Sequence, residues 1–424
     1  MTTKQACCSW AVATAAALLF AFGSLASAET TINFWYAGSA GQDKYFNGAT
    51  KRYEARHPDI KIRSTVLPSQ AKDIEAKLNA GKLSGTFPDV FAAYLIFIGT
   101  RGAQDDFASM EEYFGKWSEK DDLLSSTLEM GRFKGKLVGL GYAPAPLMQL
   151  YRKDYFKEAG LDPAKPPTTW EELHAYARKL VKRDGAGNVI RTGFDIPTMD
   201  SSNTFLEPFM RGNGSPFIDE INFAPTWTDD GAIGALDFIV KMWNEKLSVA
   251  FDFEQWGEHP ITKGHGSMGA VIGPALSEVF AKNPEFKQKI GFIPPMGPKR
   301  PYTFCGYRLF TIGKDSKVKD AAWEFIKFMM SKEEMWQRFK DEMIPPTRES
   351  LMAKFIEDDP EYNKAIADHV KYGKGKSITP WTGIANRYIE KAYQEALNGK
   401  KSARQALIDA DRDLRAELKR LGLM

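Results

Sequence analysis

Cysteine is almost absent from this chain. The 424 residues contain three cysteines, and Cys7 and Cys8 lie in an N-terminal stretch that reads as a leader. Cys305 is the only cysteine outside this stretch, so no disulfide can form within the processed chain. The fold has to be held by its hydrophobic core. We expect Cys305 to be a small buried residue and not a nucleophile.

An excess of charge of either sign is also lacking. Lys and Arg total 57 against 54 Asp and Glu, which leaves a formal net charge of +3 at pH 7. Proteins that bind nucleic acid carry dense basic patches, so this balance gives no reason to expect such a partner. Apolar residues make up 43% and charged residues 26% of the chain, which is typical of a globular protein and not of a disordered one.

Motifs for cofactors, metals and nucleophiles are missing or out of context. The five histidines are scattered and form no H-E-x-x-H pair. No G-x-S-x-G nucleophile elbow occurs. Residues 264–269 match G-x-G-x-x-G, but strand-like residues 270–272 follow where a dinucleotide fold needs a helix. We therefore expect no cofactor, no metal site and no catalysis.

The longest apolar run lies at the N-terminus. Lys4 precedes the mostly apolar residues 11–22, and Ala26 and Ala28 form an A-x-A pattern after them. The run is too short to span a bilayer, which takes about 20 residues. Residues 1–28 therefore read as a signal peptide cleaved after Ala28, and we expect the protein to be exported.

The rest of the sequence alternates short apolar strands with amphipathic helices, which is typical of α/β layering. Residues 31–36 and 60–66 read as strands on either side of a helix. Gly81 is expected to cap the next helix, and Thr169 with Glu172 to form a capping box at the start of a later one. Two such lobes would place a ligand in the crevice between them, at the carboxyl ends of strands.

Several short motifs follow one another along the chain. In order they are Phe34-Trp35-Tyr36, Arg56-His57-Pro58-Asp59, Pro88-Asp89-Val90, residues 151–162, residues 167–173, residues 266–269 and residues 321–328. Together they resemble the periplasmic sugar-binding proteins of ABC transporters, the family that includes maltose-binding protein. The resemblance covers nearly all of the chain after the leader. It implies a two-lobed periplasmic-binding-protein fold, in which each lobe is a β-sheet flanked by helices and the ligand cleft lies between the lobes.

The family's fold also implies that the chain crosses between the lobes three times. Prolines mark three places where regular elements are expected to end, at residues 142–146, 294–302 and 345–349. The implied N-terminal lobe comprises residues 29–143 and 302–346, and the C-terminal lobe comprises residues 144–301 and 347–424. The alternative is that these prolines lie in unrelated surface loops.

A sugar site needs aromatic rings beside polar side chains, because a sugar offers flat C–H faces as well as hydroxyls. Alternation places Trp35 and Tyr36 on opposite faces of their strand, so one of them is expected to pack in the core. We favour Tyr36 as the ligand contact. Further candidates lie in the following loop, at the end of another strand, near the first crossing and before two helices: Ser39, Gln42, Tyr94, Tyr142, Asn203 and Trp381. Tyr94 is equally suited to the core and Asn203 to an N-cap.

Trp381 is the strongest of these candidates, because the family commonly presents an aromatic side chain to the sugar just before this helix. The family usually carries a Gly-Gly pair where this chain has Gly306, Tyr307 and Arg308. Arg308 suits paired hydroxyls or an acidic group, and equally an interlobe salt bridge. Residues 272–276 lack the tryptophan that relatives often place there, which argues against maltose and long α-glucans.

The resemblance implies the periplasmic solute-binding component of an ABC importer. A mono- or oligosaccharide binds in the cleft, the lobes close about a hinge, and the closed protein delivers its solute to inner-membrane permease subunits. We expect the protein to be a monomer. Two alternatives stay open: a non-sugar solute such as a polyol phosphate or an organic anion, and a secreted carbohydrate-active enzyme with a raised-pKa carboxyl in its cleft.

Overall fold

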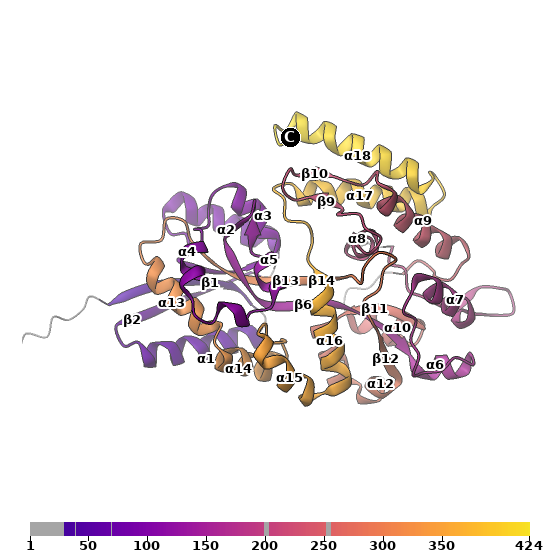
Figure 1. The fold of residues 1–424 in the computed structure, drawn as a ribbon, viewed down its shortest axis with the longest axis horizontal. Coiled ribbons are helices and arrows are strands. Elements are labelled where there is room, and N and C mark those ends of the chain that lie inside the picture. The colour runs from indigo at the N-terminus through magenta and orange to yellow at the C-terminus, as the bar shows by residue number, and fades with distance from the viewer. Residues whose placement is uncertain (1–28, 39, 69, 199–202, 252–255) are drawn as a thin grey trace, which may run out of the picture.

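Two long strands, β6 (Gly139–Arg152) and β13 (Thr303–Ile312), join two groups of elements (Figure 1). The computed structural model describes residues 29–38, 40–68, 70–198, 203–251 and 256–424. The predicted leader, residues 1–28, lies outside this part of the chain. The predicted α/β fold with two lobes is confirmed.

The first group contains the N-terminal elements and two helices that return to them from later in the chain. Its members are β1 (Thr30–Ala37), α1 (Ala40–Arg56), β2 (Ile60–Leu67), α2 (Ala71–Ser84), β3 (Val90–Tyr94), α3 (Ile96–Ala103), α4 (Glu111–Lys116), α5 (Ser125–Glu129), α13 (Lys319–Met329) and α14 (Lys332–Glu342). Helices α13 and α14, orange in Figure 1, pack beside α1 although nearly 300 residues separate them in sequence.

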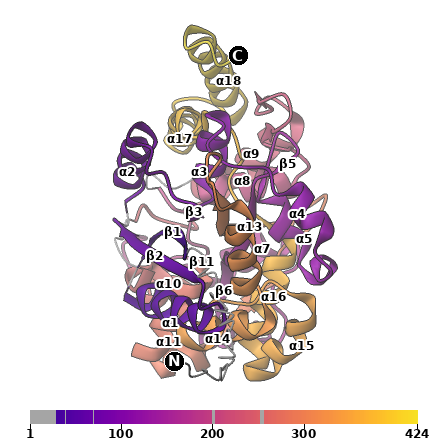
Figure 2. The ribbon, with the colours of Figure 1, turned by 90° about the vertical axis from the view of Figure 1, so that its left-hand side faces the viewer.

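The second group holds most of the middle of the chain and its C-terminal helices. Its members are α6 (Lys153–Glu158), α7 (Trp170–Leu180), α8 (Asn203–Gly212), α9 (Asp230–Asn244), α10 (Pro260–Lys263), β11 (Met268–Ile272), α11 (Gly273–Lys282), α12 (Pro284–Lys289), β12 (Ile290–Ile293), α17 (Thr382–Leu397) and α18 (Ala403–Arg420). Between the groups lie α15 (Glu349–Asp358), α16 (Pro360–Tyr372) and β14 (Gly373–Lys374). Figure 2 shows α17 and α18 at one end of the molecule and α1, α11 and α14 at the other.

The main sheet has eight strands in the order β11-β6-β13-β3-β1-β2, with β12 also paired to β6 and β14 to β13. Strand β6 pairs with β13 as far as Pro146 and with β11 from Leu147 onward. The strands of the two lobes therefore form one hydrogen-bonded network through β6.

The first predicted crossing lies inside a regular element and not at the end of one. Pro144 and Pro146 are part of β6, in the stretch that pairs with β13. Proline is tolerated there when its missing N–H faces away from the paired neighbour. The other two predicted crossings lie between elements, β12 to β13 and α14 to α15.

Of the two helix caps predicted from the sequence, one is confirmed and the other is wrong. Thr169 is the N-cap of α7 and accepts a hydrogen bond from the Glu172 N–H. The Glu172 carboxylate accepts from the Thr168 N–H at 2.7 Å. The prediction that Gly81 caps α2 is wrong, because α2 continues to Ser84 and Gly85 takes the left-handed φ of 69°. A side chain at Gly81 would press against Trp35, since an added Cβ would lie 3.0 Å from its ring.

Apolar side chains form a core in each group and a third cluster that spans both. The spanning cluster joins Phe91 and Leu95 of the first group to Leu276 and Ile290 of the second. Cys305 belongs to it and is fully buried, as predicted, and burial raises the pKa of its thiol well above the usual range. None of the helices in the described residues has both the length and the apolar character needed to cross a membrane.

Candidate ligand-binding site

A cavity of about 840 Å³ lies between the two groups of elements. One wall comes from the start of α1 and the end of α14, the other from α11, and the floor from β6 and β13. Its lining includes Gln42, Tyr94, Ala143, Pro144, Ala145, Pro274, Ala275, Ser277, Glu278, Gly306, Tyr307, Arg308, Asp341 and Glu342. Because the floor is made by the strands that join the groups, a rotation about them would narrow the cavity.

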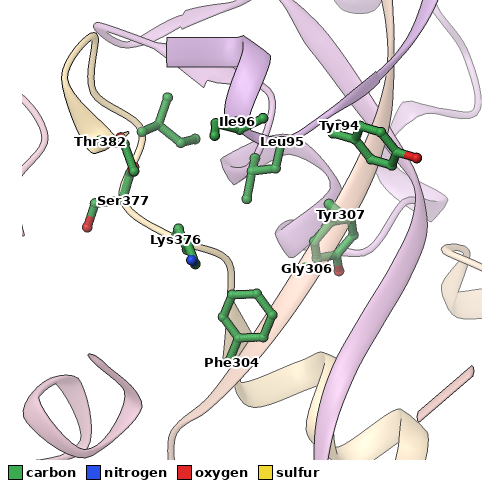
Figure 3. A pocket seen from close by; sticks show the side chains of 10 residues that line it. Tyr94, Leu95, Ile96, Phe304, Gly306, Tyr307, Lys376, Ser377 and Thr382 are labelled. Atoms are coloured by element: carbon green, nitrogen blue, oxygen red, sulfur yellow. The ribbon is translucent and has the colours of Figure 1, made fainter. Parts of the chain in front are cut away.

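A smaller cavity of about 200 Å³ adjoins the first and shares Tyr94, Gly306 and Tyr307 with it. Figure 3 shows its lining arriving from three segments. The first segment is the end of β3 with the start of α3, and the second is strand β13. The third is residues 376–382, which lead into α17. The two cavities together form one cleft, which we call the interlobe cleft.

Five of the predicted ligand-binding residues line the interlobe cleft. They are Gln42, Tyr94, Gly306, Tyr307 and Arg308. Most of the Tyr307 side chain is buried, and its hydroxyl donates to Ser126 Oγ at 2.6 Å. Tyr307 therefore contributes part of a rigid floor.

Arg308 is the one residue with a charged side chain among these five. Its guanidinium lies 5.0 Å from the centre of the Tyr94 ring, and the side chain is half-buried. Within the described residues it makes no ion pair, so an interlobe salt bridge is not formed in this conformation. A register shift between Arg308 and Leu309 places Ala143 and Gly141 opposite them and leaves Tyr142 without a partner. Such bulges commonly redirect side chains at functional sites.

Tyr36 and Trp35 lie outside the described cavities. Tyr36 is fully buried in the core of the first group, and its hydroxyl donates to Asp43 Oδ1 at 2.6 Å. Burial is the main cause that raises the pKa of its hydroxyl. Trp35 is partly buried on the other face of β1 against the spanning cluster. Both faces of this strand are covered, which alternation by itself did not indicate.

Tyr142 and Trp381 are also core residues that line neither cavity. Tyr142 stacks on Phe310 with ring centres 4.0 Å apart. Trp381 is 1% exposed and packs in the core of the second group immediately before α17. Its neighbour Thr382 lines the smaller cavity in its place.

Two further predicted residues are not among those that the structure describes in full. Ser39 lies outside the described residues. Asn203 is the first residue of α8, and its side chain also lies outside the described part of the chain.

The end of α14 supplies cleft residues that the sequence analysis did not single out. Glu342 and Asp341 line the cavity beside the crossing at residues 345–349. Burial is the largest cause that raises the pKa of Glu342, to about 7, and Asp341 adds to the effect. Arg338 and Arg308 act in the opposite direction. The available signal in the sequence was a pair of carboxylates that lie three and four residues before Pro345.

Residues 48–365 match the family of bacterial extracellular solute-binding proteins. The chain belongs to this family. Its members are solute-binding proteins and not enzymes, so the protein is a solute-binding protein, and the interlobe cleft is its candidate binding site. The alternative of a secreted carbohydrate-active enzyme is thereby set aside. The family also agrees with export from the cytoplasm, whereas cleavage after Ala28 stays a prediction.

Curated relatives of this solute-binding protein include the sn-glycerol-3-phosphate-binding periplasmic proteins UgpB of Escherichia coli K12 and Shigella dysenteriae. Each is 28% identical over 215 residues, which is 50% of this chain and 47% of the relative. The chain thus spans about half the length of the curated relatives it matches.

Solved structures resemble the fold over nearly its whole length. The cyclic α-maltosyl-1,6-maltose binding protein of Arthrobacter globiformis is 22% identical with a TM-score of 0.80, over 92% of this chain and 99% of that one. The sugar-binding protein MalE of Xanthomonas citri is 17% identical with a TM-score of 0.80 over the same shares. At such identity the likeness concerns the fold.

Proposed function

We propose that this protein is the periplasmic capture component of an ABC importer and that its solute is a mono- or oligosaccharide. The solute binds in the interlobe cleft, the two lobes close on it, and the closed protein docks on inner-membrane permease subunits. The closed form is stabilised by contacts that only the bound solute makes with both walls.

The observation that carries this proposal is the construction of the cavity. Its walls belong to different lobes, its floor is the pair of joining strands, and its volume of about 840 Å³ is in the range of small-molecule sites. The lining combines the aromatic side chain of Tyr94 with the polar side chains of Gln42, Ser277 and Arg308, which is the mixture of residue types that a sugar site requires.

A thermal-shift screen tests the solute class. The exported, processed protein is heated with neutral mono- and oligosaccharides, polyols and sugar phosphates. A solute at about 100 times its Kd adds about 2.7 kcal/mol to the free energy of unfolding, which shifts Tm by a few degrees. Chromatography of the recovered solute should show it unaltered. A consumed solute would contradict a purely binding role, and a screen without any neutral hit would remove the saccharide assignment.

A polyol phosphate is the second candidate. The observation that favours it is the match to glycerol-phosphate-binding relatives, together with the guanidinium of Arg308 in the cleft. Arginine pairs well with phosphate oxygens. Binding of sn-glycerol 3-phosphate in the same screen, with no response to neutral sugars, would select this candidate.

We further propose that the protein works as a monomer. Size-exclusion chromatography with light scattering should give the mass of one processed chain with and without solute, and a mass of two chains would contradict this.

A further inference from the structure

Two charged groups line the larger cavity from different elements and form no ion pair with each other or with another described residue. Arg308 on β13 has its ring contact with Tyr94 but no ion pair within the described residues. Glu342 at the end of α14 has a buried Oε1 without a hydrogen-bond partner in the described part of the chain. Both side chains line the same cavity, so a bound molecule can reach both.

A buried cation lies behind Glu342. Arg338 is one helical turn earlier on α14, is fully buried, and has its guanidinium 4.8 Å from the centre of the Tyr142 ring. None of its guanidinium nitrogens has a hydrogen-bond partner among the described residues. Its positive charge lowers the pKa of Glu342, against the larger effect of burial. Arg338 therefore favours the carboxylate form of Glu342 although the two side chains form no ion pair within the described residues.

We propose that Arg308 and Glu342 form a donor–acceptor pair that selects a neutral polyol, with the guanidinium donating to hydroxyl oxygens and the carboxylate accepting from hydroxyl hydrogens of one solute. Arg338 is a positioning residue that acts through Glu342. The inference rests on the proposed function and narrows its solute class.

The alternative solute, a polyol phosphate, fits the same cavity less well. The phosphate group of such a solute offers acceptors to Arg308 but no hydrogen to a carboxylate, so only its remaining hydroxyls could donate to Glu342. It would also meet Glu342, Asp341 and Glu278, which all line this cavity. Like charges within one cavity repel each other, and more strongly where water is partly excluded. A hydroxyl both donates and accepts, so it satisfies both members of the pair.

Isothermal titration calorimetry of four proteins tests the pair. The wild type, Arg308→Lys, Glu342→Gln and the double variant are titrated at pH 8 with a library of neutral sugars that begins with D-tagatose, maltose and mannobiose, and with sn-glycerol 3-phosphate. Each single variant should raise the Kd of the neutral solute roughly tenfold, because Glu342→Gln removes the charged acceptor and Arg308→Lys removes the forked donor geometry of the guanidinium. The Kd of the double variant should rise by much less than the product of the two single increases, because both groups contact the same solute.

The exposed carboxylate of Glu333, in the first turn of the same helix, provides a matched control as Glu333→Gln with unchanged affinity. A positioning role for Arg338 is tested by the pH profile of binding. The wild-type affinity should rise as Glu342 ionises near pH 7, Arg338→Met should move this rise to higher pH, and Glu342→Gln should abolish it.

The outcomes separate this inference from the proposed function. Tight binding of a neutral sugar that ignores both Arg308→Lys and Glu342→Gln would overturn the pair and leave saccharide capture standing. Binding of sn-glycerol 3-phosphate that is kept or strengthened in Glu342→Gln would overturn the pair in favour of the phosphate. Failure of every neutral member to bind would overturn both the pair and the saccharide assignment.

Discussion

At the scale of single residues, the glycine motif at 264–269 serves a buried carboxyl group and not a nucleotide. Asp195 is almost fully buried, and a Cβ added at Gly266 or Gly269 would lie 2.3 or 2.6 Å from its Oδ2. The Thr192 hydroxyl donates to Asp195 Oδ1, and His259 Nδ1 lies 3.5 Å from Oδ2. The glycines let the backbone pass close to this carboxyl group, which explains the motif by packing.

Asp195 and His259 have opposite effects on the pH dependence of stability. Burial raises the pKa of Asp195 from 3.8 to about 7, and burial lowers the pKa of His259 from 6.5 to about 3. The contribution of Asp195 to the free energy of unfolding is fully present below pH 3.8 and is lost as the pH rises through 7. The contribution of His259 to the free energy of unfolding is fully present above pH 6.5 and is lost as the pH falls through 3. Between pH 4 and 6.5 the two slopes oppose each other.

The Asp195→Asn variant should remove the pH dependence that comes from Asp195 and keep that of His259. Asparagine keeps the acceptor for Thr192 and cannot ionise, so the free energy of unfolding should rise from pH 4.5 to pH 6.5 by roughly 1–2 kcal/mol more than in the wild type. Urea denaturation at the two pH values measures this difference. The exposed Asp315→Asn serves as the control and should match the wild type. An Asp195→Asn profile parallel to that of the wild type would contradict the raised pKa of Asp195.

At the scale of elements, the sequence predicted those features that are decided by residues close together along the chain. The strands at residues 31–36 and 60–66 and the N-cap at Thr169 follow from periodicity and capping rules. The burial of individual side chains was predicted less well, because a residue at the end of a strand can face either a core or the cleft. Tyr36 and Trp381 look like cleft aromatics in sequence but lie in cores, since α1 and the second-group helices cover them. Glu342 enters the cleft only because α14 packs beside α1 across a long sequence separation.

The start of α7 offers a test of capping in this fold. The Thr169 side chain accepts from the Glu172 N–H at 3.1 Å at an exposed helix end. Thr169→Ala should lower the free energy of unfolding by about 1 kcal/mol, because an orphan N–H loses its partner. Thr169→Ser keeps the hydroxyl and should stay within a few tenths of a kcal/mol of the wild type. Equal losses in both variants would assign the effect to the lost methyl group and not to the cap.

At the scale of the whole molecule, the same two strands hold the lobes together and form the floor of the cleft. The pairing partner of β6 changes from β13 to β11 between Pro146 and Leu147. Residues 306–308 of β13 pair with β6 next to this point. Small side chains at residues 143–145 keep this floor low between the walls. The lobe boundaries predicted from the resemblance, at residues 143/144, 301/302 and 346/347, stay predictions. A motion confined to these strands and to the chain after α14 would change the cleft without disturbing either lobe core.

Closure should therefore be visible as a change in overall size. The walls at α11 and at the end of α14 belong to different lobes, and a solute that contacts both gains contacts only when they approach. Small-angle X-ray scattering should show a lower radius of gyration in saturating solute than in its absence. The Glu342→Gln variant should show the same decrease once its higher Kd is matched by more solute, because the joining strands are intact. An unchanged radius of gyration at proven saturation would mean that the solute binds to one wall without closure, and hinge closure would have to be abandoned.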